Sequence, residues 1–90
     1  MSRQELRDLL SKLHAELKNV KTADSTSRAI LRKLGRDIQR ILENSGEIPP
    51  HHHARLLESL EESVEHFEVS HPKLTSLMNT IIKNLSDMGV

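Results

Sequence analysis

Leucine, isoleucine, valine and methionine recur along the whole chain at alternating spacings of three and four residues. At about 100° per residue, such positions fall on one face of an α-helix. No segment alternates between apolar and polar residues with the period of two that marks a half-buried β-strand. The pattern predicts an all-α chain, and its 90 residues suit a single domain, residues 1–90.

Helix-capping residues and prolines divide this pattern into four amphipathic segments. Asp24 is the expected N-cap of the second segment, because a carboxylate there accepts hydrogen bonds from free backbone N–H groups. Pro49 and Pro50 cannot continue a helix, so we place a loop over residues 45–51. We therefore expect four helices, near residues 3–20, 25–44, 52–69 and 71–88.

The similar lengths of the four segments suit an antiparallel bundle in which successive helices reverse direction. The junction between the third and fourth segments runs only from Val69 through Ser70 and His71 to Pro72. Ser70 is the expected cap of the fourth helix, with Pro72 in its first turn. A reversal here is tight, and one kinked helix over residues 52–88 is the alternative. The narrow apolar rows suit either one bundle or helical hairpins that pair in a dimer.

Opposite charges separate along the chain, although its formal net charge is zero. Residues 1–45 hold ten basic and six acidic side chains, whereas residues 46–90 hold three and seven. The second segment carries four arginines spaced four residues apart and opposite its apolar face, namely Arg28, Arg32, Arg36 and Arg40. The third segment carries acidic residues largely away from its apolar face, namely Glu58, Glu61, Glu62, Glu65 and Glu68.

These charged rows allow three interpretations. They can be solvated faces that keep a bundle soluble, since exposed ion pairs contribute little stability. The basic row can dock on the acidic row of a second copy, or on a partner protein, through Arg28, Arg32, Arg36, Arg40, Glu58, Glu62 and Glu65. The arginines can also bind phosphate. Nucleic acid is disfavoured, because backbone binders are usually basic overall and this chain has no Trp or Tyr to stack on bases.

The composition excludes several kinds of chemistry. Without cysteine, the chain has no thiol nucleophile, no disulfide and no Cys-ligated zinc or iron–sulfur centre. Three glycines cannot supply a glycine-rich phosphate loop as well as the turns, and no G-x-S-x-G elbow is present. We therefore expect neither enzyme activity nor a cofactor.

The sequence carries no recognisable address. Residues 1–10 are charged and contain no apolar core, so we expect no signal peptide. No apolar run approaches the roughly 20 residues that a membrane span needs. We expect a cytoplasmic protein that does not enter a membrane.

Six histidines are the remaining candidates for site chemistry, and the role of the consecutive His51, His52 and His53 stays open. Glu62 and His66 could share a metal, but their spacing of four residues suits an exposed ion pair equally well. No paired-histidine helix motif is present, and we predict no metal site. His53 falls on the apolar side of its segment, where we expect it to be buried and hydrogen-bonded. Because histidine titrates near neutrality, the cluster could make stability or assembly depend on pH between about 5 and 7.

Both ends of the sequence resemble one protein family. The quoted stretches are Met1-Ser2-Arg3-x-x-Leu6-Arg7, Leu13-His14-x-Glu16-Leu17 and Phe67-Glu68-x-Ser70-His71-Pro72-x-Leu74-Thr75, followed by Met88-Gly89. On these residues the chain resembles the short bacterial proteins of Domain of Unknown Function 4404 over essentially its whole length. The resemblance implies an all-helical, stand-alone bacterial cytoplasmic protein and brings no catalytic residues. It draws attention to His14 and His71, which either hydrogen-bond helix ends or border a shared binding surface at one end of the bundle.

The sequence therefore favours a non-enzymatic helical module that contacts another protein or itself. Leucine and isoleucine rows would supply the affinity of that contact, and the oppositely charged halves would set its orientation. A nucleic-acid accessory protein that uses the arginine row is the alternative.

Overall fold

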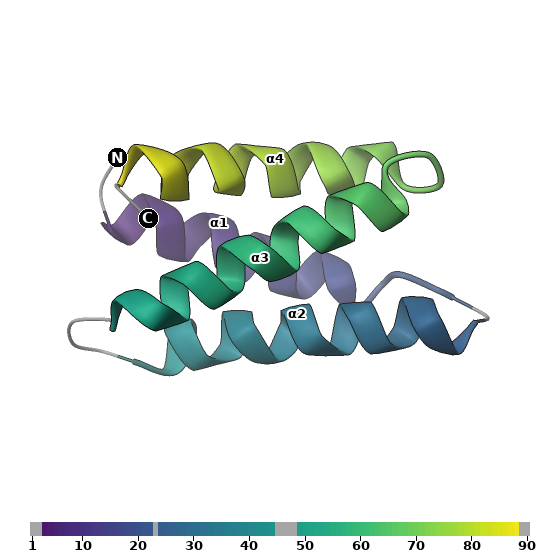
Figure 1. Cartoon of the computed structure of the whole chain (residues 1–90), viewed down its shortest axis with the longest axis horizontal. Helices are drawn as coiled ribbons and strands as arrows, with labels where there is room; N and C mark the ends of the chain where they lie inside the picture. The colour runs from purple at the N-terminus through teal and green to yellow at the C-terminus, as the bar shows by residue number, and fades with distance from the viewer. Residues whose placement is uncertain (1–2, 23, 45–48, 89–90) are drawn as a thin grey trace.

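Four α-helices make up the computed structural model, which describes residues 3–22, 24–44 and 49–88 (Figure 1). They are α1 (Arg3–Leu17), α2 (Ser25–Glu43), α3 (Pro50–Phe67) and α4 (Pro72–Asp87), and the described residues contain no strand. Successive helices run in opposite directions, so that α1 begins and α4 ends at the same end of the molecule. The predicted all-α fold is confirmed.

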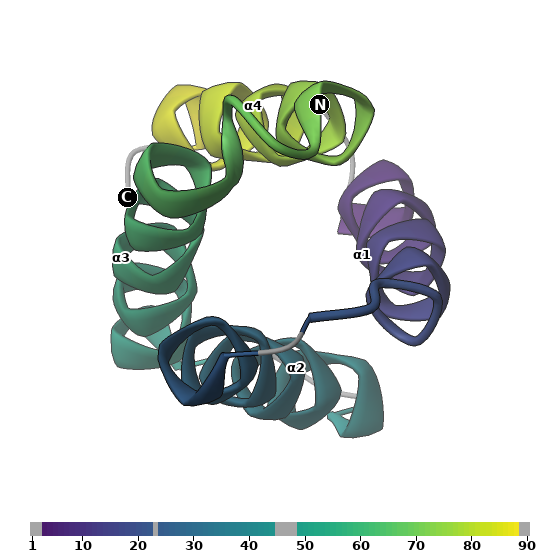
Figure 2. The same cartoon turned by 90° about the vertical axis from the view of Figure 1, so that its right-hand side faces the viewer.

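The helices stand in a ring around one core, and each packs against two neighbours (Figure 2). The neighbouring pairs are α1 with α2, α2 with α3, α3 with α4, and α4 with α1. The particle measures 37 × 21 × 19 Å, and its longest axis exceeds the roughly 28 Å of the 19-residue α2 by less than 10 Å. One chain therefore forms an antiparallel bundle, the first of the two predicted architectures.

The apolar rows meet along the bundle axis. The core comprises Leu6, Leu10, Leu13, Leu34, Ile38, Ile41, Leu56, Leu60, Leu74, Met78, Ile81 and Leu85. Flanking positions such as Leu9, Leu57 and Leu77 are partly buried against it, which widens each row to the face that a bundle needs. Among the described residues, Val69 and Met88 are the large hydrophobic side chains that remain exposed. No described helix is both long enough and apolar enough to cross a membrane.

The junction between α3 and α4 is a reversal and not a kinked helix. The backbone N–H of His71 donates to the carbonyl of Phe67 at 2.8 Å, which closes the turn immediately after α3. The Phe67 ring is buried and lies edge-on to the rings of His66 and His71. The predicted Ser70 cap is wrong, because His71 occupies the N-cap position and the Ser70 Oγ lies 2.9 Å from its Nδ1. Pro72 occupies the first turn, as predicted.

The remaining helix ends show one confirmed prediction and two corrections. Asp24 caps α2 by accepting the Ser27 N–H at 2.9 Å. Hydrogen bonds from the backbone and the side chain of Ser27 hold the pKa of the Asp24 carboxyl below its usual value. α3 begins at Pro50 and not at residue 52, because proline tolerates the first helical turn, where its missing N–H has no intrahelical acceptor. α1 ends at Leu17 and not at residue 20, because the chain turns over residues 18–19.

Candidate functional site

Polar contacts join α2 to α3 in one antiparallel register. The Ser27 Oγ lies 2.8 Å from the Nε2 of His66 near the start of α2. Further along α2, Lys33 Nζ lies 3.8 Å from the carboxylate of Glu62. Further still, the Ser59 Oγ donates to the carboxylate of Asp37 at 2.5 Å. This register fixes which charged side chains of the two helices face one another.

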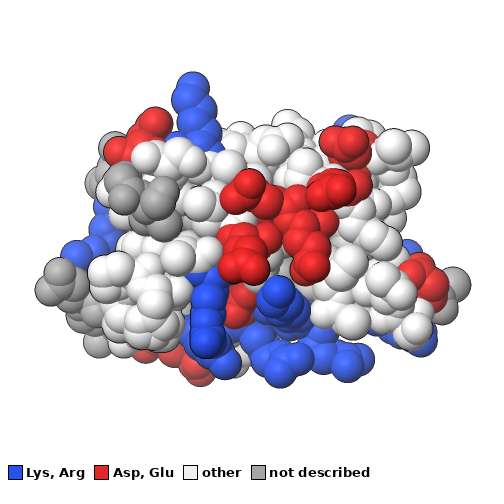
Figure 3. Space-filling view, in the orientation of Figure 1, with Lys and Arg blue, Asp and Glu red and all other residues white. Residues whose placement is uncertain are grey.

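The two charged rows therefore lie beside each other on one face of a single chain (Figure 3). Acidic side chains gather over α3, and basic side chains border them along α2. All seven residues predicted for partner contact are exposed, namely Arg28, Arg32, Arg36, Arg40, Glu58, Glu62 and Glu65. We call the surface formed by Lys33, Arg36 and Arg40 of α2 with Arg55, Glu58, Glu62 and Glu65 of α3 the charged face of α2 and α3.

The arginine row does not run straight along α2. Four residues exceed a turn of 3.6 residues, so each step of the row drifts about 40° around the helix. Arg36 and Arg40 consequently line a groove against α3, whereas Arg28 and Arg32 do not. The sequence pattern identified the row correctly but not its division into two parts.

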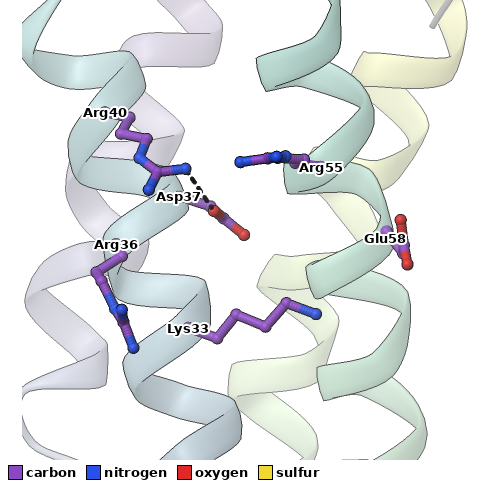
Figure 4. A pocket seen from close by; sticks show the side chains of 6 residues that line it. All are labelled: Lys33, Arg36, Asp37, Arg40, Arg55 and Glu58. Carbon is purple, nitrogen blue, oxygen red and sulfur yellow. Dashed lines mark ion pairs between the residues drawn. The ribbon is translucent and has the colours of Figure 1, made fainter.

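The groove has a volume of about 330 Å³ and lies between α2 and α3 (Figure 4). Its lining residues are Lys33, Arg36, Asp37, Arg40, Arg55 and Glu58. Lys33 and Arg40 reach from α2 into the space between the helices, and Arg55 reaches toward them from α3. Four cations and two carboxylates leave the groove with a formal excess of two positive charges.

Asp37 anchors this groove. It is 8% exposed, and its carboxylate accepts the Ser59 hydroxyl while Arg40 Nη1 lies 3.9 Å from its other oxygen. A buried carboxylate is stable only when it is paired and hydrogen-bonded in this way. Ser63 is also buried, and its hydroxyl donates to the Ser59 carbonyl at 2.8 Å, so it adds to the polar strip between the helices.

Sequence reasoning missed the roles of Lys33, Asp37 and Arg55 in this groove. A signal was present for Asp37, which stands three residues after Leu34 and four before Ile41, on the flank of the buried row. In α3, Ser59 stands three residues after Leu56, and Ser63 stands three residues after Leu60 and four before Phe67. Arg55 belongs to the groove only because the antiparallel register places it opposite Arg40, which a single sequence does not reveal.

The acidic residues predicted for partner contact have separate surroundings. Glu58 lines the groove, but its carboxylate points away from α2 in Figure 4. Glu62 pairs with Lys33, and both side chains remain about half exposed. Glu65 and His66 line a hollow of about 450 Å³ together with Ile30 and Glu62.

The three consecutive histidines occupy the first turns of α3. His52 Nδ1 and His53 Nε2 are shielded from solvent and have no hydrogen-bond partner in the part of the chain that the structure describes. His53 was predicted to be buried and hydrogen-bonded. Its side chain is half-buried, and among the described residues the predicted hydrogen bond is absent at the shielded Nε2. Desolvation lowers the pKa of both imidazoles, helped at His52 by His51, Arg40 and Arg55. Within the described ranges, no three His, Asp or Glu side chains form a group able to hold a metal ion.

His71 and His14 have different surroundings. His71 lines a hollow of about 550 Å³ between the end of α1 and the start of α4, where Glu16, Val20 and Leu74 also lie. His14 is half-buried on α1 and is not among the residues lining that hollow. A binding surface shared by His14 and His71 stays a prediction.

Fold and surface together define a small antiparallel four-helix bundle whose outer face carries adjoining basic and acidic rows with a cationic groove between them. The chain belongs to the family described as domain of unknown function DUF4404, whose model matches residues 6–90. Comparison with curated proteins gives no match, and comparison with solved structures gives none either.

Proposed function

We propose that this protein is a non-enzymatic helical interaction module that contacts a second copy of itself through the charged face of α2 and α3. The observation that carries the proposal is the presence of a basic row and an acidic row side by side on that face. In keeping with the family resemblance, the proposal places this contact in the bacterial cytoplasm.

The burial of the apolar rows directs the contact to charged residues. The leucine and isoleucine rows are buried inside the chain, so they cannot supply the affinity of a second contact as the sequence suggested. Exposed large hydrophobic side chains among the described residues are confined to Val69 and Met88. The most distinctive exposed feature of the described surface is therefore its charge pattern.

The charge pattern is complementary to itself. When two such faces meet about a two-fold axis parallel to the helices, the basic row of each copy lies against the acidic row of the other. Each pair occurs twice by symmetry, which is the geometry of the commonest soluble dimers. The same complementarity disfavours a sideways displacement of one copy that would place like charges of the two copies together.

Such a contact is expected to be weak and sensitive to salt. Exposed ion pairs contribute about 0.2–1 kcal/mol each, and salt screens them over about 10 Å. Lys33 and Glu62 already pair within one chain, so part of the charge is engaged before association. The expected dimer therefore forms at low ionic strength and at high protein concentration.

Sedimentation equilibrium at low and high salt tests the proposal. We expect self-association at low salt that disappears at high salt and that is abolished by R32E combined with R36E. The matched control is K12E combined with K83E, which makes the same charge change at exposed positions of α1 and α4. A monomer at all salt concentrations, or equal loss in the control variant, would overturn the proposal.

A nucleic-acid accessory role is the second candidate, and the exposed arginines of α2 favour it. The neighbouring glutamates of α3 oppose it, because they repel a phosphate backbone that follows the arginine row. The chain has no Trp or Tyr, so bound nucleic acid is readily seen by its ultraviolet absorbance. Copurified nucleic acid that leaves the protein as salt rises would favour this candidate.

A further inference from the structure

We propose that the groove between α2 and α3 is a binding site for a small phosphorylated ligand, whose phosphoryl dianion is held by Arg36, Arg40, Arg55 and Lys33. This site goes beyond the proposed self-association, because it is complete within one chain. A phosphoryl group can bind there when no second copy is present, and two charged faces can meet when the groove is empty.

The arrangement of like charges carries the inference. Arg40 on α2 and Arg55 on α3 extend into the same space from opposite walls of the groove. Two guanidinium groups that face each other repel unless an anion lies between them. Among the described residues, neither Arg36 nor Arg55 forms an ion pair, so their N–H donors are available to a ligand.

The Asp37 carboxylate lies in the groove and pairs with Arg40, so it neutralises one cation and leaves Arg36 and Arg55 without an ion pair among the described residues. Asp37 is held low in the groove by the Ser59 hydroxyl and by Arg40, and this contact fixes the direction of the Arg40 side chain. Glu58 directs its carboxylate away from α2. The positive charge that remains faces the open side of the groove.

Charge, donor geometry and size indicate the class of ligand. Guanidinium groups present a planar fork of N–H donors that matches phosphate oxygens in a bidentate fashion. Lys33 is paired with Glu62 and Arg40 with Asp37, so Arg36 and Arg55 carry the positive charge that is left for a phosphoryl group. The volume of about 330 Å³ lies at the lower end of ligand pockets, which run from about 300 to 1,000 Å³, so it suits one or two phosphoryl groups on a small molecule and not a polymer.

The site is tested by titrating the purified protein with inorganic phosphate and with pyrophosphate at constant ionic strength. NMR of the backbone and arginine side-chain N–H groups monitors the titration. We expect saturable one-to-one binding with shifts centred on Arg36, Arg40 and Arg55. R55Q should weaken binding about tenfold or more, and R55K should weaken it less, because lysine keeps the charge but not the fork. K83Q removes the same charge from an exposed position on α4 and should change the Kd less than about twofold.

Several results would overturn the site. Shifts that grow without saturation, or equal weakening by K83Q, would show only general attraction of anions to the protein. Equal affinity for the dicarboxylate succinate would show that the groove selects charge and not phosphoryl groups. Tighter binding of a short oligonucleotide than of pyrophosphate would show that the arginine row follows a backbone. Arg55 lies on the exposed side of α3, and the circular dichroism spectrum of the R55Q variant verifies that the bundle is intact.

Discussion

Arg7 on α1 holds the C-terminal end of α2, and its replacement tests how the first two helices are joined. Its Nη1 donates to the carbonyls of Ile41 at 3.0 Å and Asn44 at 2.9 Å, and its Nη2 donates to the carbonyl of Leu42 at 2.6 Å. The last carbonyls of a helix have no partner within the helix, and they carry its negative dipole end. One guanidinium therefore satisfies the carbonyls of Leu42 and Asn44, adds a second donor to the Ile41 carbonyl, which also accepts the Asn44 N–H, and places a positive charge where the helix favours it.

The size of the effect follows from these contacts. A hydrogen bond to a charged group contributes about 1.5–3 kcal/mol, but three bonds to one side chain are not additive. Arg7 is half-buried, so water can replace part of what the R7A variant removes. We expect R7A to lower the free energy of unfolding by about 2–3 kcal/mol, including the dipole contribution of about 0.3–1 kcal/mol. R7K keeps the charge but cannot present a fork, and we expect it to lose about half as much.

Thermal and urea denaturation followed by circular dichroism measure this loss. For a domain of this size, R7A should lower the Tm by roughly 8–24 °C. K12A provides the control, because Lys12 is exposed on the same helix, and its change should stay within about 0.5 kcal/mol. If R7A loses no more stability than K12A, the guanidinium does not join α1 to α2 as described.

Three further predictions concern the core, α2 and the histidines. L60A should lower the free energy of unfolding by about 2–5 kcal/mol in urea denaturation, because Leu60 is fully buried; a loss below about 1 kcal/mol would contradict its packing. G35A should stabilise the protein by about 0.5–1 kcal/mol, because an added Cβ meets nothing within 4 Å and alanine favours the helix, whereas a lower Tm would contradict this. The pKa values of His52 and His53 are lowered from 6.5, so below that pH the unfolded chain binds more protons than the folded one. Stability should therefore fall as pH is lowered from about 7.5 to about 5.5, and the double variant H52Q/H53Q should reduce the slope of Tm against pH; a flat Tm in the unchanged protein would refute this.

Local rules predicted most of the fold. The apolar spacing predicted all four helices, because apolar residues spaced three and four apart share one face only when the segment is helical. Asp24 was identified as a cap because its chemistry is strictly local. The start of α3 was misplaced because a proline can either end a loop or occupy the first turn of a helix, whereas Pro72 of α4 was placed correctly and only its cap was assigned one residue too early.

The site was only partly predictable, because it depends on which residues of two helices face each other. The exposed arginines and glutamates were visible as rows in the sequence. Their arrangement beside each other in one chain follows from the antiparallel packing of α2 against α3 and from the register of Asp37 with Ser59. The position of Arg55 opposite Arg40 across the groove follows from the same register, which the sequence does not specify.

A charge-exchange experiment tests most directly whether the charged face is the contact between two copies. One variant, R32E/R36E, makes the face acidic, and a second variant, E61K/E65K, reverses part of the acidic row and leaves the Lys33–Glu62 pair intact. Each variant alone should be a monomer at low salt, and their mixture should form a heterodimer in sedimentation equilibrium, because the complementary rows are restored between different chains. A mixture that stays monomeric while the unchanged protein dimerises would show that the contact lies elsewhere on the bundle.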